Sequence, residues 1–157
     1  MRRRIYAAAL KRGFGVAVAV ACMGPATSFA QSTSEKAIKT RQSAYYLMSQ
    51  QMARINATLK GEGAFDRASL VESADAVELI GRIVVHYYPP GSDQGDTKAR
   101  PDIWKEAPRF RQLSENLQAE STKLKVAINS GDLSLIKAAY GATSKSCKAC
   151  HDVYKER

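Results

Sequence analysis

The apolar residues of this chain recur at helical spacing in four segments. In residues 34–60 they follow one another at intervals of three, four or seven, which places them on one stripe of a helix. Residues 67–86, 102–129 and 132–154 repeat the pattern. Pro108 is expected to interrupt the third segment and to leave a short separate piece around Ile103 and Trp104. The stripe of the first segment consists of Ile38, Tyr45, Met48, Met52, Ile55 and Leu59.

Residues that end or begin helices separate these segments. Gly61-Glu62-Gly63 ends the first segment, and Asp66 and Asp132 are N-cap candidates for the second and the fourth. Ser130-Gly131 breaks the chain before Asp132, whereas Pro89-Pro90-Gly91 opens a longer loop between the second and third segments. The pattern predicts an all-α fold, an up-down-up-down antiparallel four-helix bundle with one long connection.

Residues 1–30 have the composition of a secretory signal peptide. Their first twelve residues carry five basic side chains and no acidic one, and residues 13–23 form a short apolar run. Ser28-Phe29-Ala30 places small residues at the positions that a signal peptidase reads, so we expect cleavage between Ala30 and Gln31 and a periplasmic protein of one domain, residues 31–157. The apolar run is too short for a permanent membrane span, and we expect none elsewhere.

The positive charge of the chain lies mostly in this predicted signal. The whole chain has a formal net charge of +9 from 24 basic and 15 acidic residues. Five basic residues and no acidic ones lie in residues 1–30, so residues 31–157 keep a charge of only +4. This charge gives no case for binding nucleic acid.

The chemistry of the chain is concentrated in the sequence Cys147-Lys148-Ala149-Cys150-His151. C-x-x-C-H is the attachment signature of a c-type haem, with the histidine as an axial ligand of the iron. Three alternatives remain: a thioredoxin-like redox pair, a structural zinc site that would need His86 or Cys22, and a disulfide. The motif continues the apolar stripe of the last helix, so we expect one covalently attached haem c inside the bundle, with His151 as metal ligand.

Several segments, together with this motif, resemble the cytochrome c′ family, the class II c-type cytochromes. The resemblance covers essentially all of residues 31–157 and implies a four-helix bundle with the haem bound on its last helix. The segments that carry it are Thr40-Arg41-Gln42-Ser43-Ala44, Leu59-Lys60-Gly61-Glu62, Arg100-Pro101-Asp102-Ile103-Trp104 and Ser146-Cys147-Lys148-Ala149-Cys150-His151-Asp152.

The resemblance also implies roles for residues outside the motif. It places Tyr45 over the distal face of the iron, where low-spin members of the c-556 type carry a methionine, and so implies a five-coordinate, high-spin haem. Arg41 is implied to pair with a haem propionate, with Gln42 nearby, and Lys155 matches a basic position on the proximal side.

Other interpretations of these positions stay open. Tyr45 can be a plain core aromatic or itself a ligand, and Arg41 can be a solvated charge. Met48 or Met52, on the same stripe, can be proposed as the sixth ligand, although methionine at helical spacing is more often core packing. His86 is more simply a helix-end residue than a ligand.

The resemblance implies a protein that binds nitric oxide, and carbon monoxide, at an open haem site, and that scavenges or carries nitric oxide. The alternative is a low-spin, c-556-type cytochrome that transfers electrons to a partner protein. We do not expect an enzyme, because a peroxidase would need a distal histidine–arginine pair that is not evident. Whether the chain forms a homodimer, as members of the family do, is left open.

Overall fold

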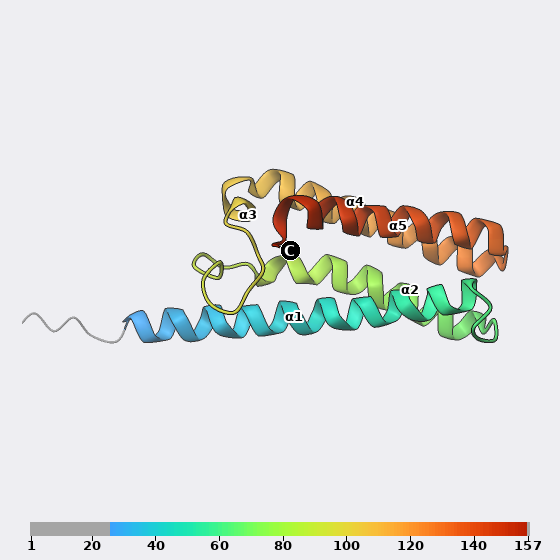
Figure 1. The fold of residues 1–157 in the computed structure, drawn as a ribbon, viewed down its shortest axis with the longest axis horizontal. Helices are drawn as coiled ribbons and strands as arrows, with labels where there is room; N and C mark the ends of the chain where they lie inside the picture. The colour runs from blue at the N-terminus through green and yellow to red at the C-terminus, as the bar shows by residue number, and fades with distance from the viewer. Residues whose placement is uncertain (1–25, 157) are drawn as a thin grey trace, which may run out of the picture.

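The structure, a computed structural model, describes residues 26–156 (Figure 1). It confirms the predicted all-α fold, and its one pairing of β type within that range is an isolated bridge between Ala99 and Lys155. The elements are α1 (Ala26–Leu59), α2 (Arg67–Val84), the 3-10 helix η1 (Val85–Tyr87), α3 (Asp102–Lys105), α4 (Ala107–Ser130) and α5 (Leu133–Tyr154). Residues 1–25 of the predicted signal peptide lie outside the described residues. From residue 26 to residue 156, no helix is both long and apolar enough to cross a membrane.

The predicted capping residues set the helix ends. Asp66 accepts a hydrogen bond from the backbone N–H of Ala68 at 3.1 Å, and Asp132 accepts from those of Ser134 and Leu135 at 2.8 and 3.2 Å. These carboxylates satisfy N–H groups that the first turn of a helix leaves without partners. Gly131, directly after the last residue of α4, adopts the left-handed conformation, with φ of +75°.

The third apolar segment is divided, as expected, into a short and a long helix. Glu106 has φ of −111° and ψ of 37°, so the helical conformation is lost there, and Pro108 lies in the first turn of α4. A proline is tolerated in this turn because its missing N–H would have had no helical partner. Two boundaries differ from expectation: α1 begins at Ala26 rather than near residue 34, and α2 gives way to η1 at Val85.

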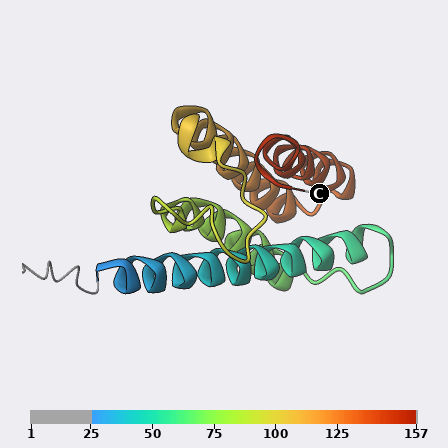
Figure 2. The ribbon, with the colours of Figure 1, turned by 60° about the vertical axis from the view of Figure 1, so that its left-hand side comes forward.

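The four long helices share a core only at one end of the bundle. There, α1 meets the other three helices in a cluster of buried apolar side chains: Ile55, Leu70, Ala74, Leu124, Ala127, Ile128 and Ile136. Toward the other end, α1 packs on α2 through Met48 and Val77, while α4 stays beside α5 (Figures 1 and 2). A third cluster, of Ile103, Phe110 and Tyr154, joins α3, α4 and the end of α5. The core thus leaves α1 and α5 apart where the C-x-x-C-H motif lies.

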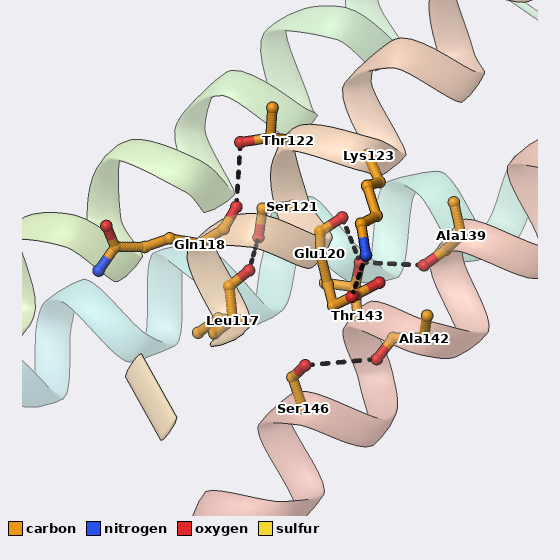
Figure 3. A network of polar contacts seen from close by, with 10 residues as sticks. All are labelled: Leu117, Gln118, Glu120, Ser121, Thr122, Lys123, Ala139, Ala142, Thr143 and Ser146. Atoms are coloured by element: carbon orange, nitrogen blue, oxygen red, sulfur yellow. Dashed lines mark hydrogen bonds and ion pairs between the residues drawn. The ribbon is translucent and has the colours of Figure 1, made fainter. Parts of the chain in front are cut away.

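Small polar side chains line the contact between α4 and α5 (Figure 3). The fully buried Thr143 hydroxyl lies 3.2 Å from the carbonyl oxygen of Glu120 across the contact and 3.0 Å from that of Ala139 in its own helix. Ser121, also fully buried, donates to the carbonyl of Leu117 at 2.8 Å. These hydroxyl groups stay hydrogen-bonded without leaving the interior, and the contact of Thr143 with Glu120 links α5 to α4.

We expect Gly131→Ala to destabilise the protein by about 1 kcal/mol. Its positive φ disfavours any side chain, and an added Cβ would lie 2.5 Å from Nη2 of Arg67, which would have to move. The matched control is Gly141→Ala inside α5, where an added Cβ meets nothing within 4 Å. There the higher helix propensity of alanine should raise the free energy of unfolding by up to about 1 kcal/mol. Denaturant unfolding of both variants measures the difference, and equal midpoints would contradict this account.

Candidate cofactor site

A cavity of about 750 Å³ lies between α1 and α5 and is bordered by the loop that precedes α3. This volume is within the range of roughly 300 to 1,000 Å³ typical of sites for small molecules and cofactors. Its lining includes every residue that the sequence singled out for the site: Arg41, Gln42, Tyr45, Cys147, Cys150, His151 and Lys155. The fold therefore brings together residues more than 100 positions apart, while their individual roles stay predictions.

The C-x-x-C-H motif lies on the α5 wall of this cavity. Cys147 and Cys150 are half-buried free thiols, three residues apart on the same face of the helix. Burial, and then the neighbouring Cys147, raises the pKa of Cys150 to about 11, so this thiol is protonated at neutral pH. Partial desolvation, with the positive charge of Lys155, lowers the pKa of His151, although Asp152 opposes the shift. His151 is therefore neutral, the form that binds a metal.

The structure gives little support to the other interpretations of the motif. Among the described residues, no three His, Cys, Asp or Glu side chains are grouped so that they could hold a metal ion. His86 is an exposed residue of η1, and Cys22 lies outside the described residues. Between residues 26 and 156, no strand provides the setting of a thioredoxin-like site, and the pairing of Lys155 with Ala99 is an isolated bridge.

Two tyrosines form part of the wall that faces the motif. Tyr45, on α1, and Tyr88, just after η1, bring their hydroxyl oxygens within 3.2 Å of each other. Burial is the main cause that raises the pKa of both phenols, and the shift of Tyr45 is large. Tyr45 is thus a neutral phenol at physiological pH, which disfavours its acting as a phenolate ligand of a metal.

Arg41 is buried, with 3% of its surface exposed, so its interpretation as a solvated charge is wrong. Its guanidinium donates to Oγ and the carbonyl oxygen of Ser92, at 2.8 and 2.5 Å, and to Oγ1 of Thr97 at 2.7 Å. Gln42, the next residue, donates to the carbonyl of Asp96 at 2.8 Å. Both side chains line the cavity and at the same time hold the loop before α3 against α1.

The two methionines of α1 belong to the apolar core. Met48 is 5% exposed and packs with Val77 and Val84, while Met52 is half-buried and contacts two core clusters. Both also border the cavity, but these contacts favour core packing over a ligand role.

The loop before α3 carries the residues that the sequence did not mark as part of the site. Ser92 is completely buried although it lies among prolines and glycines, because it accepts hydrogen bonds from Arg41. Tyr88 is the exception, since the family resemblance includes an aromatic residue near this loop that could edge the distal pocket. The loop also pairs with the end of the chain: the N–H of Arg100 donates to the carbonyl of Tyr154, and that of Glu156 to Lys98, at 3.0 and 2.9 Å.

The residues around the cavity fit a c-type haem. Two thiols on one helical face can each reach one vinyl group, and the adjacent neutral imidazole can take the iron. The apolar body of a haem suits the side chains that border the cavity, among them Val84, Ile103 and Leu113. Exposed Lys155 and the guanidinium of Arg41 supply positive charge for propionates.

Comparison with known proteins gives a consistent result. The sequence profile of the family described as Cytochrome C' matches residues 36–155. The chain is similar to the cytochrome c′ of Alcaligenes xylosoxydans xylosoxydans, with 36% identity over 123 residues that cover 78% of this chain and 95% of that one. It is also similar to the cytochrome c′ of Rubrivivax gelatinosus, with 35% identity over 77% of this chain and 95% of that one.

Solved structures show the same likeness in three dimensions. Cytochrome c prime from Shewanella frigidimarina superposes with a TM-score of 0.74 at 38% identity, covering 79% of this chain and 97% of that one. A variant of cytochrome c prime from Alcaligenes xylosoxidans, solved as its nitric oxide complex, gives a TM-score of 0.73 at 35% identity, with 79% and 97% covered. The predicted four-helix bundle architecture is confirmed by these neighbours.

Proposed function

Because this chain belongs to the cytochrome c′ family, we propose that it is a periplasmic haem protein that binds nitric oxide and carbon monoxide at an open axial site. Relatives of known structure have been solved with nitric oxide bound, which supports this ligand class. We propose further that it scavenges or carries nitric oxide as a binding protein rather than as an enzyme. The periplasmic location rests on the signal peptide predicted for residues 1–30.

One haem c is held covalently on α5 in this proposal. The thiols of Cys147 and Cys150 would hold the haem through its two vinyl groups, and the neutral imidazole of His151 would bind the iron. When bound, the haem would supply an iron able to take up a small neutral ligand. Arg41 and Lys155 balance the propionate charges, and Gln42 stays beside Arg41. The apolar lining excludes water from the porphyrin faces.

The observation that carries the proposal is Tyr45 on the α1 wall of the cavity, the position where the family resemblance implies a methionine in low-spin members. A buried phenol that keeps its proton does not replace a methionine sulfur as the sixth ligand. Tyr45 also crowds the distal space, so the ligands with the strongest bonds to ferrous iron are favoured, nitric oxide first and carbon monoxide next.

We expect the ferrous holoprotein to have a high-spin absorption spectrum that changes on addition of carbon monoxide and of nitric oxide. The reason is the absence of a protein ligand opposite His151 in the proposed site. Titration with each gas, followed by absorption spectroscopy, checks the expectation. A split low-spin spectrum that carbon monoxide leaves unmoved would show that a side chain fills the sixth position.

A second candidate function is one-electron transfer. Lys145 and Lys155 are exposed on or next to the wall that carries the motif, where they can attract an acidic partner, whereas Lys148 is paired with Asp152 at 2.5 Å. The spectrum described above separates the two functions. A sixth protein ligand would favour fast electron transfer, whereas an open site would favour gas binding. The redox partner and the homodimer stay predictions.

A further inference from the structure

His151 lies in the last turn of α5, where a helix is held least firmly. Three residues of α5 follow it, and the carbonyl groups at the end of a helix have no partners within that helix. Such ends open more readily than the middle of a helix. Among residues 26–156, the imidazole of His151 has no hydrogen-bonding partner, so the direction of the ring depends on the backbone of this turn.

The backbone of the last turn is tied down at both of its ends. The N–H of Lys155 donates to the carbonyl of His151 at 3.2 Å, and the N–H of Arg100 donates to the carbonyl of Tyr154 at 3.0 Å. The first contact closes the turn, and the second attaches it to the loop before α3. Two carbonyl groups of the last turn therefore have partners that a free helix end would lack.

The side chain of Tyr154 attaches the same turn to a second element. Its ring is buried and packs edge-on against Phe110, with centroids 5.5 Å apart, and its hydroxyl donates to Oε2 of Glu106 at 2.9 Å. Burial, and then the Glu106 carboxylate, raises the pKa of the Tyr154 phenol, so it keeps its proton and stays a donor at neutral pH. A hydrogen bond to a charged acceptor is stronger than one between neutral groups.

Glu106 is a firm point of attachment because its own backbone is held on both sides. It lies between α3 and α4, its N–H donates to the carbonyl of Asp102 at 2.8 Å, and its carbonyl accepts from the N–H of Phe110 at 3.0 Å. On its outer side, the carboxylate forms an ion pair with the exposed Arg109 at 3.2 Å. The Tyr154 hydroxyl is thus bound to a part of the fold that does not belong to α5.

We infer that Tyr154 is a positioning residue, whose hydrogen bond to Glu106 fixes the last turn of α5 and so directs the imidazole of His151 toward the haem iron. The inference rests on the proposed function, since it requires a haem bound through His151. Groups around a ligating histidine commonly orient it by bonding to its ring. Here the orientation comes through the backbone, from a side chain three residues further on. Without this bond the imidazole would take several orientations, and its bond to the iron would weaken.

The test compares the ferrous holoprotein with Tyr154→Phe, which removes only the hydroxyl, and with Glu106→Ala, which removes the acceptor. Hydrogen exchange of the Lys155 amide should become roughly 10-fold faster in both variants, as expected for the loss of one hydrogen bond to a charged group. The iron–histidine stretching band in the resonance Raman spectrum should broaden and move to lower wavenumber. Glu106→Gln should keep the wild-type band, because the amide oxygen of glutamine still accepts from Tyr154.

Arg109→Gln is the control, since it removes the ion pair of Glu106 and leaves the hydrogen bond from Tyr154 in place. It should change neither measurement. If one of the two variants fails to fold, the other supplies the same comparison.

Three results would count against the inference. A wild-type protein without an iron–histidine band overturns the proposed haem site and this inference with it. Faster exchange with an unchanged band shows that Tyr154 has a structural role without an effect on His151, and unchanged exchange shows that it does not hold the turn. Each of the last two results overturns the inference alone.

Discussion

Replacing Tyr45 with methionine is expected to convert the haem from high-spin to six-coordinate and low-spin. The position faces the cavity from α1, opposite the wall that carries His151. The family resemblance implies that low-spin members of the c-556 type carry methionine there. A thioether at this place can reach the iron, whereas the protonated phenol of Tyr45 does not bind it. The absorption spectrum of the ferrous variant should show the split low-spin bands, and the affinity for carbon monoxide should fall at least about 100-fold.

A methionine placed nearby but outside the cavity provides the control. Leu47, two residues further along α1, is 49% exposed and does not line the cavity, so Leu47→Met should keep the wild-type spectrum. If Tyr45→Met also stays high-spin and binds carbon monoxide as before, the side chain at position 45 does not face the iron. The assignment of the distal residue, and with it the proposed open site, would then have to be revised.

Removing both thiols, in the variant Cys147→Ala/Cys150→Ala, is expected to abolish covalent haem attachment. The denatured variant should show no haem on a gel, because only the two thioether bonds survive unfolding. The folded variant should also lose stability. A ligand present at 100 times its dissociation constant stabilises a protein by about 2.7 kcal/mol. Loss of a haem bound at least this well should therefore lower the melting temperature by roughly 10 °C.

The control for this variant lies inside the motif. Lys148 is exposed and forms an ion pair with Asp152, so Lys148→Ala should retain the haem and lose little stability. Haem that stays with the double variant after denaturation would show that other side chains hold it. Haem lost on denaturation from the wild type as well would show that the cavity binds its cofactor without thioether bonds.

The fold could be predicted because local signals and the apolar pattern agree. Asp66 and Asp132 mark helix ends by the hydrogen bonds that their side chains accept, and Gly131 does so by the positive φ that its lack of a side chain allows. These effects depend on only a few neighbouring residues. The start of α1 at Ala26 did not follow from the sequence, because residues 26–30 were assigned to the predicted signal peptide. The change from α2 to η1 depends on how the chain turns into the loop.

The two walls of the site differed in how far the sequence revealed them. On α5, a motif of five consecutive residues specifies both thiols and the imidazole. The facing wall depends on contacts between distant segments, such as the one between the hydroxyls of Tyr45 and Tyr88. The anchoring of Arg41 by Ser92 could not be predicted, because a serine in a loop of prolines and glycines has no pattern that indicates burial.

The loop before α3 connects the two walls of the cavity. At one end it is fastened to α1 through Arg41, and at the other it is fastened to the end of α5 by the hydrogen bonds of Arg100 and Glu156 (Figure 1). It therefore acts as a spacer between the two walls of the cavity, where α1 and α5 do not pack on each other. Insertions or deletions in this loop would widen or narrow the space for a cofactor and leave the helical core unchanged, so ligand preference can diverge without any change in the bundle.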